Sequence, residues 1–319
     1  MRGAVGLAAL IVALATCISA VISCGSSKAI STEPIRTELV RLQKQTGLTL
    51  LTFYQDLNVL SFDGRSVSHQ HVLSEGGPLW GAVSHDGTKV ALQLSHFGEH
   101  HAPSLGVVSI DGRDLRDYLE IAAPSSMCWS YRGSELVIST QGASLDSVLQ
   151  TVDLPSGANQ TIDVRAYVSS QCFSPDDKQI VYEADDNVRI VEVSKGKSGI
   201  RIVARGHKPS WSPDGRWIAF WDSGTYYAIG PSGEDRKTLF REGQAASPLW
   251  WSPDSSVVAF ISPVTISEGE VPIDAEKYRL RVRRLSDGSQ DWIAEGVSGG
   301  ANYQWVFARD LLDPLGLAK

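Results

Sequence analysis

The sequence predicts an all-β protein, a six-bladed β-propeller of four-stranded blades whose ring is closed by the C-terminal strand. Three observations lead to this prediction. A tight-turn element recurs along the chain, a second turn follows each copy, and a segment near the C-terminus resembles the start of another unit. A period of about 43 residues with four short strands in each unit is typical of propeller blades.

The recurring element consists of an aromatic or apolar residue, a serine, a tight turn and a β-branched run. Its five copies are VSHDGTKVAL (83–92), WSYRGSELVI (129–138), FSPDDKQIVY (173–182), WSPDGRWIAF (211–220) and WSPDSSVVAF (251–260). Proline presets φ at the first corner of such a turn, and Asp and Gly tolerate the remaining geometry. Because the flanking residues favour strands, each copy predicts a β-hairpin.

A second turn follows each hairpin. It occurs as Asp63-Gly64, Asp111-Gly112, Ser156-Gly157, Lys195-Gly196, Ser232-Gly233 and Asp287-Gly288. The second turns therefore predict six blades, whereas the first element occurs five times. We expect the missing innermost strand at 302–307 (NYQWVF), paired with strands near 48–73, because this pairing would remove the open edge of a linear array.

The SPDG element at 212–215 and its copies resemble the TolB-like, or WD40-like, propeller repeat over roughly 48–310. TolB carries an additional α/β domain before its propeller. Residues 24–47 are long enough only for a tether with one short helix near 34–45, and 311–319 form a tail. Propellers of this type also precede the catalytic domain of dipeptidyl-peptidase IV relatives. No α/β-hydrolase domain is expected after the propeller here, which argues against peptidase activity.

The first 23 residues are expected to form a lipoprotein signal peptide. Arg2 precedes an uncharged apolar stretch over 4–22, and the segment VISC ends at Cys24. This pattern resembles a bacterial lipobox, which implies cleavage before Cys24 and a lipid anchor on its sulfur. The alternatives are a plain secretory signal and an uncleaved single-span anchor. In the lipoprotein pattern, Gly25 after the lipidated cysteine implies sorting to the outer membrane of a diderm host, facing the periplasm. In a monoderm host, the same signal implies attachment to the outer face of the plasma membrane.

The charge of the chain argues against nucleic acid as a partner. The chain has 29 basic and 36 acidic residues, a net charge of −7, and no run of Lys or Arg. A nucleic-acid-binding surface needs a concentrated basic patch. We expect instead a monomer that binds an envelope protein, peptide or glycan and contacts the membrane through the anchor.

Candidate ligand-binding residues gather in the segment SHFGEHH (95–101). His96, His100 and His101 are the candidate metal ligands, with Glu99 beside them, and His207 is expected on the same loop face. Imidazoles and a carboxylate suit zinc or another divalent transition metal. Oligogalacturonate lyases are broadly similar, since they are propellers that hold a metal through histidines at the channel mouth. The alternative is a solvated polar loop, and no other cofactor is expected.

Two further groups are candidates for the mouth of the channel. Trp80 and Tyr303 lie on predicted innermost strands, where aromatic rings would suit a sugar or a peptide. An insertion over 263–277 is acidic, through Glu268, Glu270 and Asp274 among others. It predicts a loop that docks a partner or a cation. The alternative is a solvated insertion, which loop-closure entropy tolerates.

The repeat also makes predictions about the core. Four aromatic residues share one repeat position, which favours packing between blades: Trp129, Phe173, Trp211 and Trp251. Cys128 and Cys172 occupy equivalent positions one residue earlier. Rotational symmetry would point their side chains in the same sense, so we expect two buried free thiols despite an oxidising compartment.

Two functional hypotheses follow from these observations. The first is a cell-envelope lipoprotein whose propeller is a non-catalytic binding scaffold at its channel-mouth loops. The second is a metal-dependent extracytoplasmic enzyme, a polysaccharide lyase or hydrolase, that uses the histidines of 96–101. Since propellers host both kinds of function, the fold alone does not choose between them.

Overall fold

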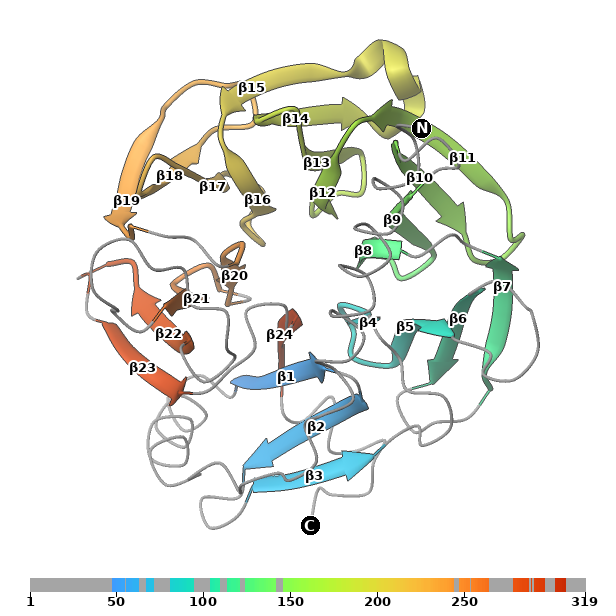
Figure 1. Cartoon of the computed structure of the whole chain (residues 1–319), viewed down its shortest axis with the longest axis horizontal. Helices are drawn as coiled ribbons and strands as arrows, with labels where there is room; N and C mark the ends of the chain where they lie inside the picture. Colours follow the sequence, from blue (N-terminus) through green and yellow to red (C-terminus); the bar gives the residue numbers. More distant parts are fainter. Residues whose placement is uncertain are drawn as a thin grey trace, which may run out of the picture. The chain divides into compact units, whose positions relative to one another are not determined.

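The computed structural model divides the chain into two units, residues 1–33 and 34–319, and all described residues belong to the second. The described residues are 48–54, 56–62, 67–71, 81–94, 104–109, 114–120, 124–141, 146–243, 247–252, 254–263, 278–286, 288, 290–295 and 302–307. Within them the strands form six four-stranded antiparallel sheets, numbered here in chain order (Figure 1). The prediction of an all-β propeller with four-stranded blades is confirmed.

Each sheet contains strands that follow one another in the chain, with one addition in sheet 1. Sheet 1 contains β24 (Asn302–Phe307), β1 (Leu48–Tyr54), β2 (Asp56–Phe62) and β3 (Val67–His71). Sheet 2 contains β4 (Gly81–Val83), β5 (Lys89–Leu94), β6 (Ser104–Ser109) and β7 (Arg116–Glu120). Sheet 3 contains β8 (Pro124–Trp129), β9 (Glu135–Gln141), β10 (Ser147–Asp153) and β11 (Asn159–Arg165).

Sheets 4 to 6 follow the same order. Sheet 4 contains β12 (Val168–Phe173), β13 (Gln179–Ala184), β14 (Asn187–Glu192) and β15 (Arg201–Arg205), with a 3-10 segment, η1 (Val193–Gly199), before β15. Sheet 5 contains β16 (His207–Trp211), β17 (Ile218–Asp222), β18 (Thr225–Ile229) and β19 (Lys237–Arg241). Sheet 6 contains β20 (Trp250–Trp251), β21 (Val257–Pro263), β22 (Tyr278–Arg284) and β23 (Gln290–Glu295).

The repeated serine organises the turn between the first two strands of sheets 2 to 6. In sheet 5 the Ser212 hydroxyl donates to Asp214 Oδ1 at 2.6 Å and accepts the backbone N–H of Trp217 at 2.9 Å. The same acceptor bond forms at Ser84, Ser130, Ser174 and Ser252. Since these serines are buried, the bonds satisfy polar groups that would otherwise be costly to bury. This explains why serine recurs in every copy of the element.

The repeated aromatic residues join neighbouring sheets. Trp129 is 1% exposed and packs with Ala82 and Leu105 of sheet 2, and Phe173 is fully buried among residues of sheets 3 and 4. Trp211 and Trp251 occupy the same place in the next two interfaces. The prediction that these rings pack between blades is confirmed.

The indole nitrogens of these tryptophans have different partners. Trp129 Nε1 donates to the Ala82 carbonyl at 2.8 Å, and Trp251 Nε1 donates to Ser210 Oγ at 3.1 Å. Ala82 and Ser210 occupy the same repeat position in the preceding sheet. Trp211 Nε1 is buried and has no hydrogen-bond partner among the described residues. The corresponding residue in its preceding sheet is Cys172.

In sheets 4 and 6 a side chain at the turn-glycine position links the turn to the turn of the preceding sheet. In sheet 4 this position holds Asp177, with φ of 60°, and in sheet 6 it holds Ser255, with φ of 59°. The Asp177 carboxylate accepts the backbone N–H groups of Tyr131 and Arg132, at 2.6 and 3.0 Å. Ser255 Oγ accepts the N–H of Asp214 at 3.3 Å. The non-glycine residues therefore occupy a left-handed conformation and contribute bonds between sheets.

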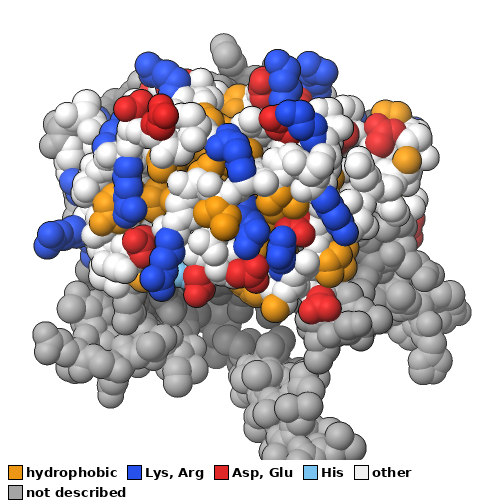
Figure 2. All heavy atoms as spheres, turned by 90° about the horizontal axis from the view of Figure 1, so that it is seen from above, with side chains coloured by type: hydrophobic (Ala, Val, Ile, Leu, Met, Phe, Trp, Pro, Cys, Tyr) orange, Lys and Arg blue, Asp and Glu red, His pale blue; other side chains and the backbone are white. Residues whose placement is uncertain are grey.

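The outermost strands of sheets 3 to 5 are sheet edges that carry charge. Arg205, Lys237 and Arg241 are exposed on β15 and β19. Exposed apolar side chains also lie on these strands, Val164 of β11 at 42% and Ile202 of β15 at 56% exposure. Figure 2 shows Lys and Arg side chains interspersed with hydrophobic ones over one face of the molecule. Charged side chains on an edge strand discourage pairing with a second chain.

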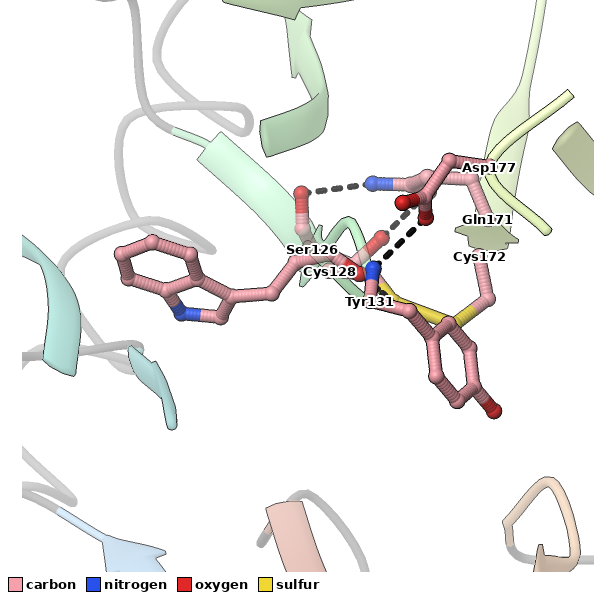
Figure 3. The surroundings of a disulfide bond; sticks show 7 residues. Ser126, Cys128, Tyr131, Gln171, Cys172 and Asp177 are labelled. Carbon is pink, nitrogen blue, oxygen red and sulfur yellow. Dashed lines mark hydrogen bonds between the residues drawn. A yellow bond between two sulfur atoms is a disulfide. The ribbon is translucent and has the colours of Figure 1, made fainter. Parts of the chain in front are cut away.

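Cys128 and Cys172 form a disulfide between β8 and β12, with their Cα atoms 5.3 Å apart (Figure 3). The prediction of two buried free thiols is therefore wrong. It assumed that rotational symmetry keeps the two sulfurs apart, but the innermost strands of sheets 3 and 4 lie close enough at this position for a disulfide to span the distance between the Cα atoms. Both cysteines are also half-buried rather than buried.

No helix within the described part of the chain has the length and apolar character needed to cross a membrane.

Candidate functional site

Only one of the predicted site residues has a described side chain, His207. Tyr303 lies in β24, where only the backbone is described. The other predicted residues lie outside the described part of the chain: Cys24, Trp80, His96, Glu99, His100, His101, Glu268, Glu270 and Asp274. The metal site predicted at 95–101 and the acidic insertion at 263–277 therefore stay predictions. Among the described residues, no group of three or more His, Cys, Asp or Glu side chains could hold a metal ion.

His207 is held by a buried carboxylate of the neighbouring sheet. It is the first residue of β16, and its Nδ1 lies 2.9 Å from Glu183 Oε1 near the end of β13. Glu183 is 7% exposed, and its Oε2 accepts the backbone N–H of Lys208 at 2.8 Å and the hydroxyl of Ser169 at 3.4 Å. A hydrogen bond at Nδ1 sets which ring nitrogen carries the proton. With Nδ1–H donating to Glu183, Nε2 is the nitrogen that can accept a proton or bind a ligand.

The backbone before His207 explains its position. Gly206 has φ of 147°, and its N–H donates to the carbonyl of Asp186 at 3.0 Å. A Cβ at Gly206 would lie 2.6 Å from Phe220 Cδ2 and 2.8 Å from the Trp221 carbonyl oxygen. Only glycine therefore allows β16 to enter against β17 here. Gly206 therefore allows His207 to begin β16 at a point where β16 and β17 lie close together.

Lys208 adds a half-buried cation near this carboxylate. Burial lowers the pKa of the Lys208 ammonium below its usual value, and the nearby Glu183 carboxylate offsets part of that effect. The backbone of Lys208 has φ of 54°, in the left-handed region. Unusual backbone conformations persist where the surrounding structure holds them in place, and they concentrate at functional sites.

A second pair of polar side chains crosses from sheet 3 to sheet 4 (Figure 3). The Ser126 hydroxyl donates to Gln171 Oε1 at 2.6 Å, and Gln171 Nε2 donates to the Ser126 carbonyl at 2.7 Å. Gln171 is 4% exposed and precedes Cys172 of the disulfide. We call the two groups together the inner polar cluster: Ser126, Ser169, Gln171, Glu183, His207 and Lys208.

The inner polar cluster lies on the strands nearest the common centre of the sheets and on the end of β13. Strands β8, β12 and β16 are the innermost strands of sheets 3, 4 and 5 in Figure 1. Ser169 and His207 lie at the starts of their strands, at the end opposite the serine turns. This places the cluster at the face that carries the connections between sheets, where binding residues concentrate in rigid scaffolds.

The chemistry of the cluster favours polar recognition. A carboxylate–imidazole pair can orient a proton-transfer group or a single metal ligand. Nucleophilic catalysis by such a pair requires a nucleophile in contact with it. Among the described residues, the hydroxyl within hydrogen-bond reach of Glu183 is that of Ser169, and it contacts the carboxylate rather than the imidazole.

Sequence reasoning missed Glu183, although a signal for it was present. Gln93 and Ser139 occupy the position of Glu183 in the repeats of sheets 2 and 3, and all three residues are buried. A charged residue at a buried strand position requires a partner. That requirement could have directed attention to the connection entering the next sheet, where His207 lies.

No family model matches the chain, and no curated protein matches it either. Solved structures do match. TolB from Acinetobacter baumannii is 14% identical, with a TM-score of 0.59 over 88% of this chain and 73% of that chain. The fold is a TolB-like β-propeller. The TolB-like propeller also matches a chain of a nidogen/laminin complex at 8% identity, with a TM-score of 0.60 over 81% of this chain and 98% of that chain.

A third match is to an enzyme. An oligogalacturonate lyase in complex with manganese is 14% identical, with a TM-score of 0.54 over 78% of each chain. At these identities the likeness establishes the TolB-like fold alone.

Proposed function

We propose that the chain is a cell-envelope lipoprotein whose TolB-like propeller is a non-catalytic binding scaffold. A protein, peptide or glycan partner would dock at the channel-mouth loops around the inner polar cluster. The observation that carries this proposal is the Glu183–His207 pair, which holds an imidazole on the connection face without a nucleophile against it among the described residues. Such a group offers a directional hydrogen bond to a partner.

An extracytoplasmic location is part of the proposal. The disulfide between Cys128 and Cys172 supports it, because structural disulfides persist in oxidising compartments and are rare in the cytosol. The pattern before Cys24 supports lipid attachment at that residue and anchoring to the membrane. Two or more acyl chains would give stable anchoring. TolB among the similar structures agrees with an envelope role.

We further infer that the six sheets are six blades of one closed ring. Pairing of β1 with β24 supports this, with Leu48 opposite Phe307 and Phe53 opposite Asn302. Contacts of β24 with both β20 and β4 also support it, since they connect the last sheet to the first two. A closed ring would leave no sheet face without a neighbour.

Site-specific photocrosslinking in cells tests the binding proposal. Tyr167 is 55% exposed and lies beside the start of β12, on the connection face. Arg216 has 77% of its side chain exposed and lies in a serine turn at the other end of the strands. A crosslinking residue at 167 should give discrete adducts that a matched residue at 216 does not.

The proposal also requires that the crosslinked adducts formed from position 167 depend on the inner polar cluster. Glu183→Gln should weaken the adducts formed from position 167, because an amide has one acceptor oxygen and cannot serve both the His207 Nδ1–H and the Lys208 N–H. Adducts of equal strength from 167 and 216, or adducts indifferent to Glu183→Gln, would contradict the proposed docking face.

The second candidate function is a metal-dependent polysaccharide lyase or hydrolase that uses His96, His100 and His101. The fold shared with a manganese-bound oligogalacturonate lyase favours it. Bound zinc, manganese and calcium should be measured in the purified chain and in the variant with all three histidines changed to Ala. Stoichiometric metal that is lost in the variant would favour the enzyme, and metal indifferent to the change would exclude this histidine site.

A further inference from the structure

Basic side chains are concentrated on the outer strands of two neighbouring sheets. Residues 193–205, which form η1 and β15, and residues 236–241, which include β19, contain seven Lys or Arg and no Asp or Glu. The outermost strands β7, β11 and β23 of sheets 2, 3 and 6 each contain at least one acidic residue, and β3 of sheet 1 has no Lys or Arg. The basic composition therefore distinguishes sheets 4 and 5 from the others.

The two basic segments lie beside each other. The Arg201 guanidinium, at the start of β15, donates to the carbonyl of Pro231 in the turn between β18 and β19. A Cβ at Gly233 of the same turn would lie 3.7 Å from the Val203 carbonyl oxygen, which is an ordinary contact distance. In Figure 1, β15 and β19 are the strands of sheets 4 and 5 farthest from the common centre of the sheets. Their basic side chains therefore belong to one outer surface.

Most of these cations have no carboxylate partner. Lys195 Nζ lies 2.7 Å from Glu192 Oε2, and Arg236 Nη2 lies 3.5 Å from Asp222 Oδ2. Within the described part of the chain, the other five form no ion pair, and we call them the basic stripe: Lys197, Arg201, Arg205, Lys237 and Arg241. The bond from Arg201 to a carbonyl neutralises no charge. Four members of the stripe are exposed, and Arg201 is half-buried.

The excess of positive charge remains when the acidic residues near the stripe are included. Residues 192–242 contain nine Lys or Arg and six Asp or Glu, a net charge of +3. The rest of the chain carries a net charge of −10. Because charge is segregated in this way, an anionic partner is attracted to this side of the chain although the whole chain is acidic.

The spacing of the stripe indicates the size of the partner. Arg201 and Arg205 lie at the two ends of β15, and Lys237 and Arg241 lie at the two ends of β19. At the usual rise of a strand, the Cα atoms at the two ends are about 13 Å apart. A small anion cannot contact both ends at once, whereas an extended anionic surface can. Ile202 lies between the two arginines of β15 and is 56% exposed.

We propose that the basic stripe rests against a bilayer surface that contains anionic lipid. Lipid headgroups present many negative charges over a broad surface, and clusters of Lys and Arg bind them. An exposed apolar side chain such as Ile202 would enter the headgroup region. The inference rests on the lipid anchor of the proposed function, which would hold the chain at a bilayer. It goes beyond that function because it assigns the side of the propeller that faces the membrane.

Photocrosslinking to lipid tests the inference with the full chain in vesicles. The vesicles contain phosphatidylcholine alone or phosphatidylcholine mixed with phosphatidylglycerol, which is anionic. A photoreactive residue at position 202 should form lipid adducts, and one at the exposed Leu115 of sheet 2 should form few. Adducts from 202 should be at least fivefold more abundant with phosphatidylglycerol. They should decrease as sodium chloride is added, since salt screens exposed charges.

Charge variants test whether the stripe is responsible. A triple variant of exposed stripe residues should reduce the adducts from 202 at least fivefold: Arg205→Gln, Lys237→Gln, Arg241→Gln. A matched control removes three exposed cations from the serine turns and should change the adducts less than twofold: Arg132→Gln, Lys178→Gln, Arg216→Gln. Circular dichroism checks the folding of both variants. If the stripe variant does not fold, the salt and lipid dependence of the wild-type adducts still decides.

Vesicle flotation separates failure of the stripe from failure of the anchor. If the chain floats with both kinds of vesicle, three results overturn the stripe and leave the anchor: equal adducts from 202 and 115, adducts indifferent to phosphatidylglycerol, or equal losses in the two triple variants. Flotation only with phosphatidylglycerol, lost in the stripe variant, supports the stripe and contradicts the anchor. Flotation with neither kind overturns both. Discrete protein adducts from 202 in cells, in place of lipid adducts, would assign this surface to a protein partner and overturn the proposal.

Discussion

Replacing either cysteine of the Cys128–Cys172 disulfide should lower the free energy of unfolding, but by different amounts. The bridge closes a loop with a sequence separation of 44. Loss of its constraint on the unfolded chain corresponds to about 4 kcal/mol in the chain-entropy model. This contribution disappears in Cys128→Ser and in Cys172→Ser alike.

The difference between the two variants comes from Trp211. Its buried Nε1 has no partner among the described residues, and Cys172 occupies the position at which Ser210 accepts the bond from Trp251. Cys172 also packs against the cluster that contains Trp211. A serine at 172 supplies the missing acceptor, and a buried hydrogen bond contributes about 1 kcal/mol. Cys172→Ser should therefore be about 1 kcal/mol more stable than Cys128→Ser.

Equilibrium urea unfolding, followed by circular dichroism without reductant, measures both effects. The double variant Cys128→Ser, Cys172→Ser should match Cys172→Ser, and wild type with reductant should approach Cys128→Ser. Equal free energies for the two single variants would refute the proposed shortage of an acceptor at Trp211. Variants as stable as wild type would refute the disulfide itself.

Three further predictions concern the serine turns. Asp177→Gly should lower the free energy of unfolding by roughly 1 to 2 kcal/mol in urea titrations although glycine suits the left-handed backbone, because two backbone N–H groups lose their shared acceptor. Ser212→Ala should cost about 1 to 2 kcal/mol in the same measurement, because the partly buried N–H of Trp217 loses its acceptor. The hydrogen bond from Ser174 holds the pKa of Asp176 below its ordinary value, so Ser174→Ala should raise that pKa in an NMR titration.

The last of these has a consequence for the pH dependence of stability. A carboxyl group whose pKa is lower in the folded chain stabilises it above the unfolded pKa, near 3.9 for Asp. That contribution is lost as the pH falls through the lower folded value of Asp176. Acid unfolding in Ser174→Ala should therefore depend less steeply on pH below about 4 than in wild type. An unchanged profile would contradict the role given to the Ser174 hydroxyl, and the exposed Ser232→Ala serves as the control.

The propeller could be predicted because its signals are local. A serine, a proline and an Asp-Gly corner determine a turn within a few residues, and five copies at similar spacing indicate the unit. Packing of Trp129 and its counterparts follows from the same spacing. None of these inferences requires knowledge of how one sheet meets the next in atomic detail.

The site and the disulfide depend on that detail. Glu183 and His207 are 24 residues apart and meet because β13 ends where β16 begins. The bridge between Cys128 and Cys172 depends on how closely β8 and β12 approach, with the two Cα atoms 5.3 Å apart. Distances between residues of neighbouring sheets therefore decide the features that spacing alone could not predict.

The pairing of β1 with β24 has a consequence for chain connectivity. Leu48 and Phe307 are opposite one another, and neighbouring strands lie about 5 Å apart, so the first and last described residues of the propeller could be joined by a very short peptide. The order of the sheets along the chain could therefore be changed without changing which sheets are neighbours in space. A circular permutant that joins 307 to 48 and opens the turn at 230–233 should form the same sheets, with its new ends in sheet 5.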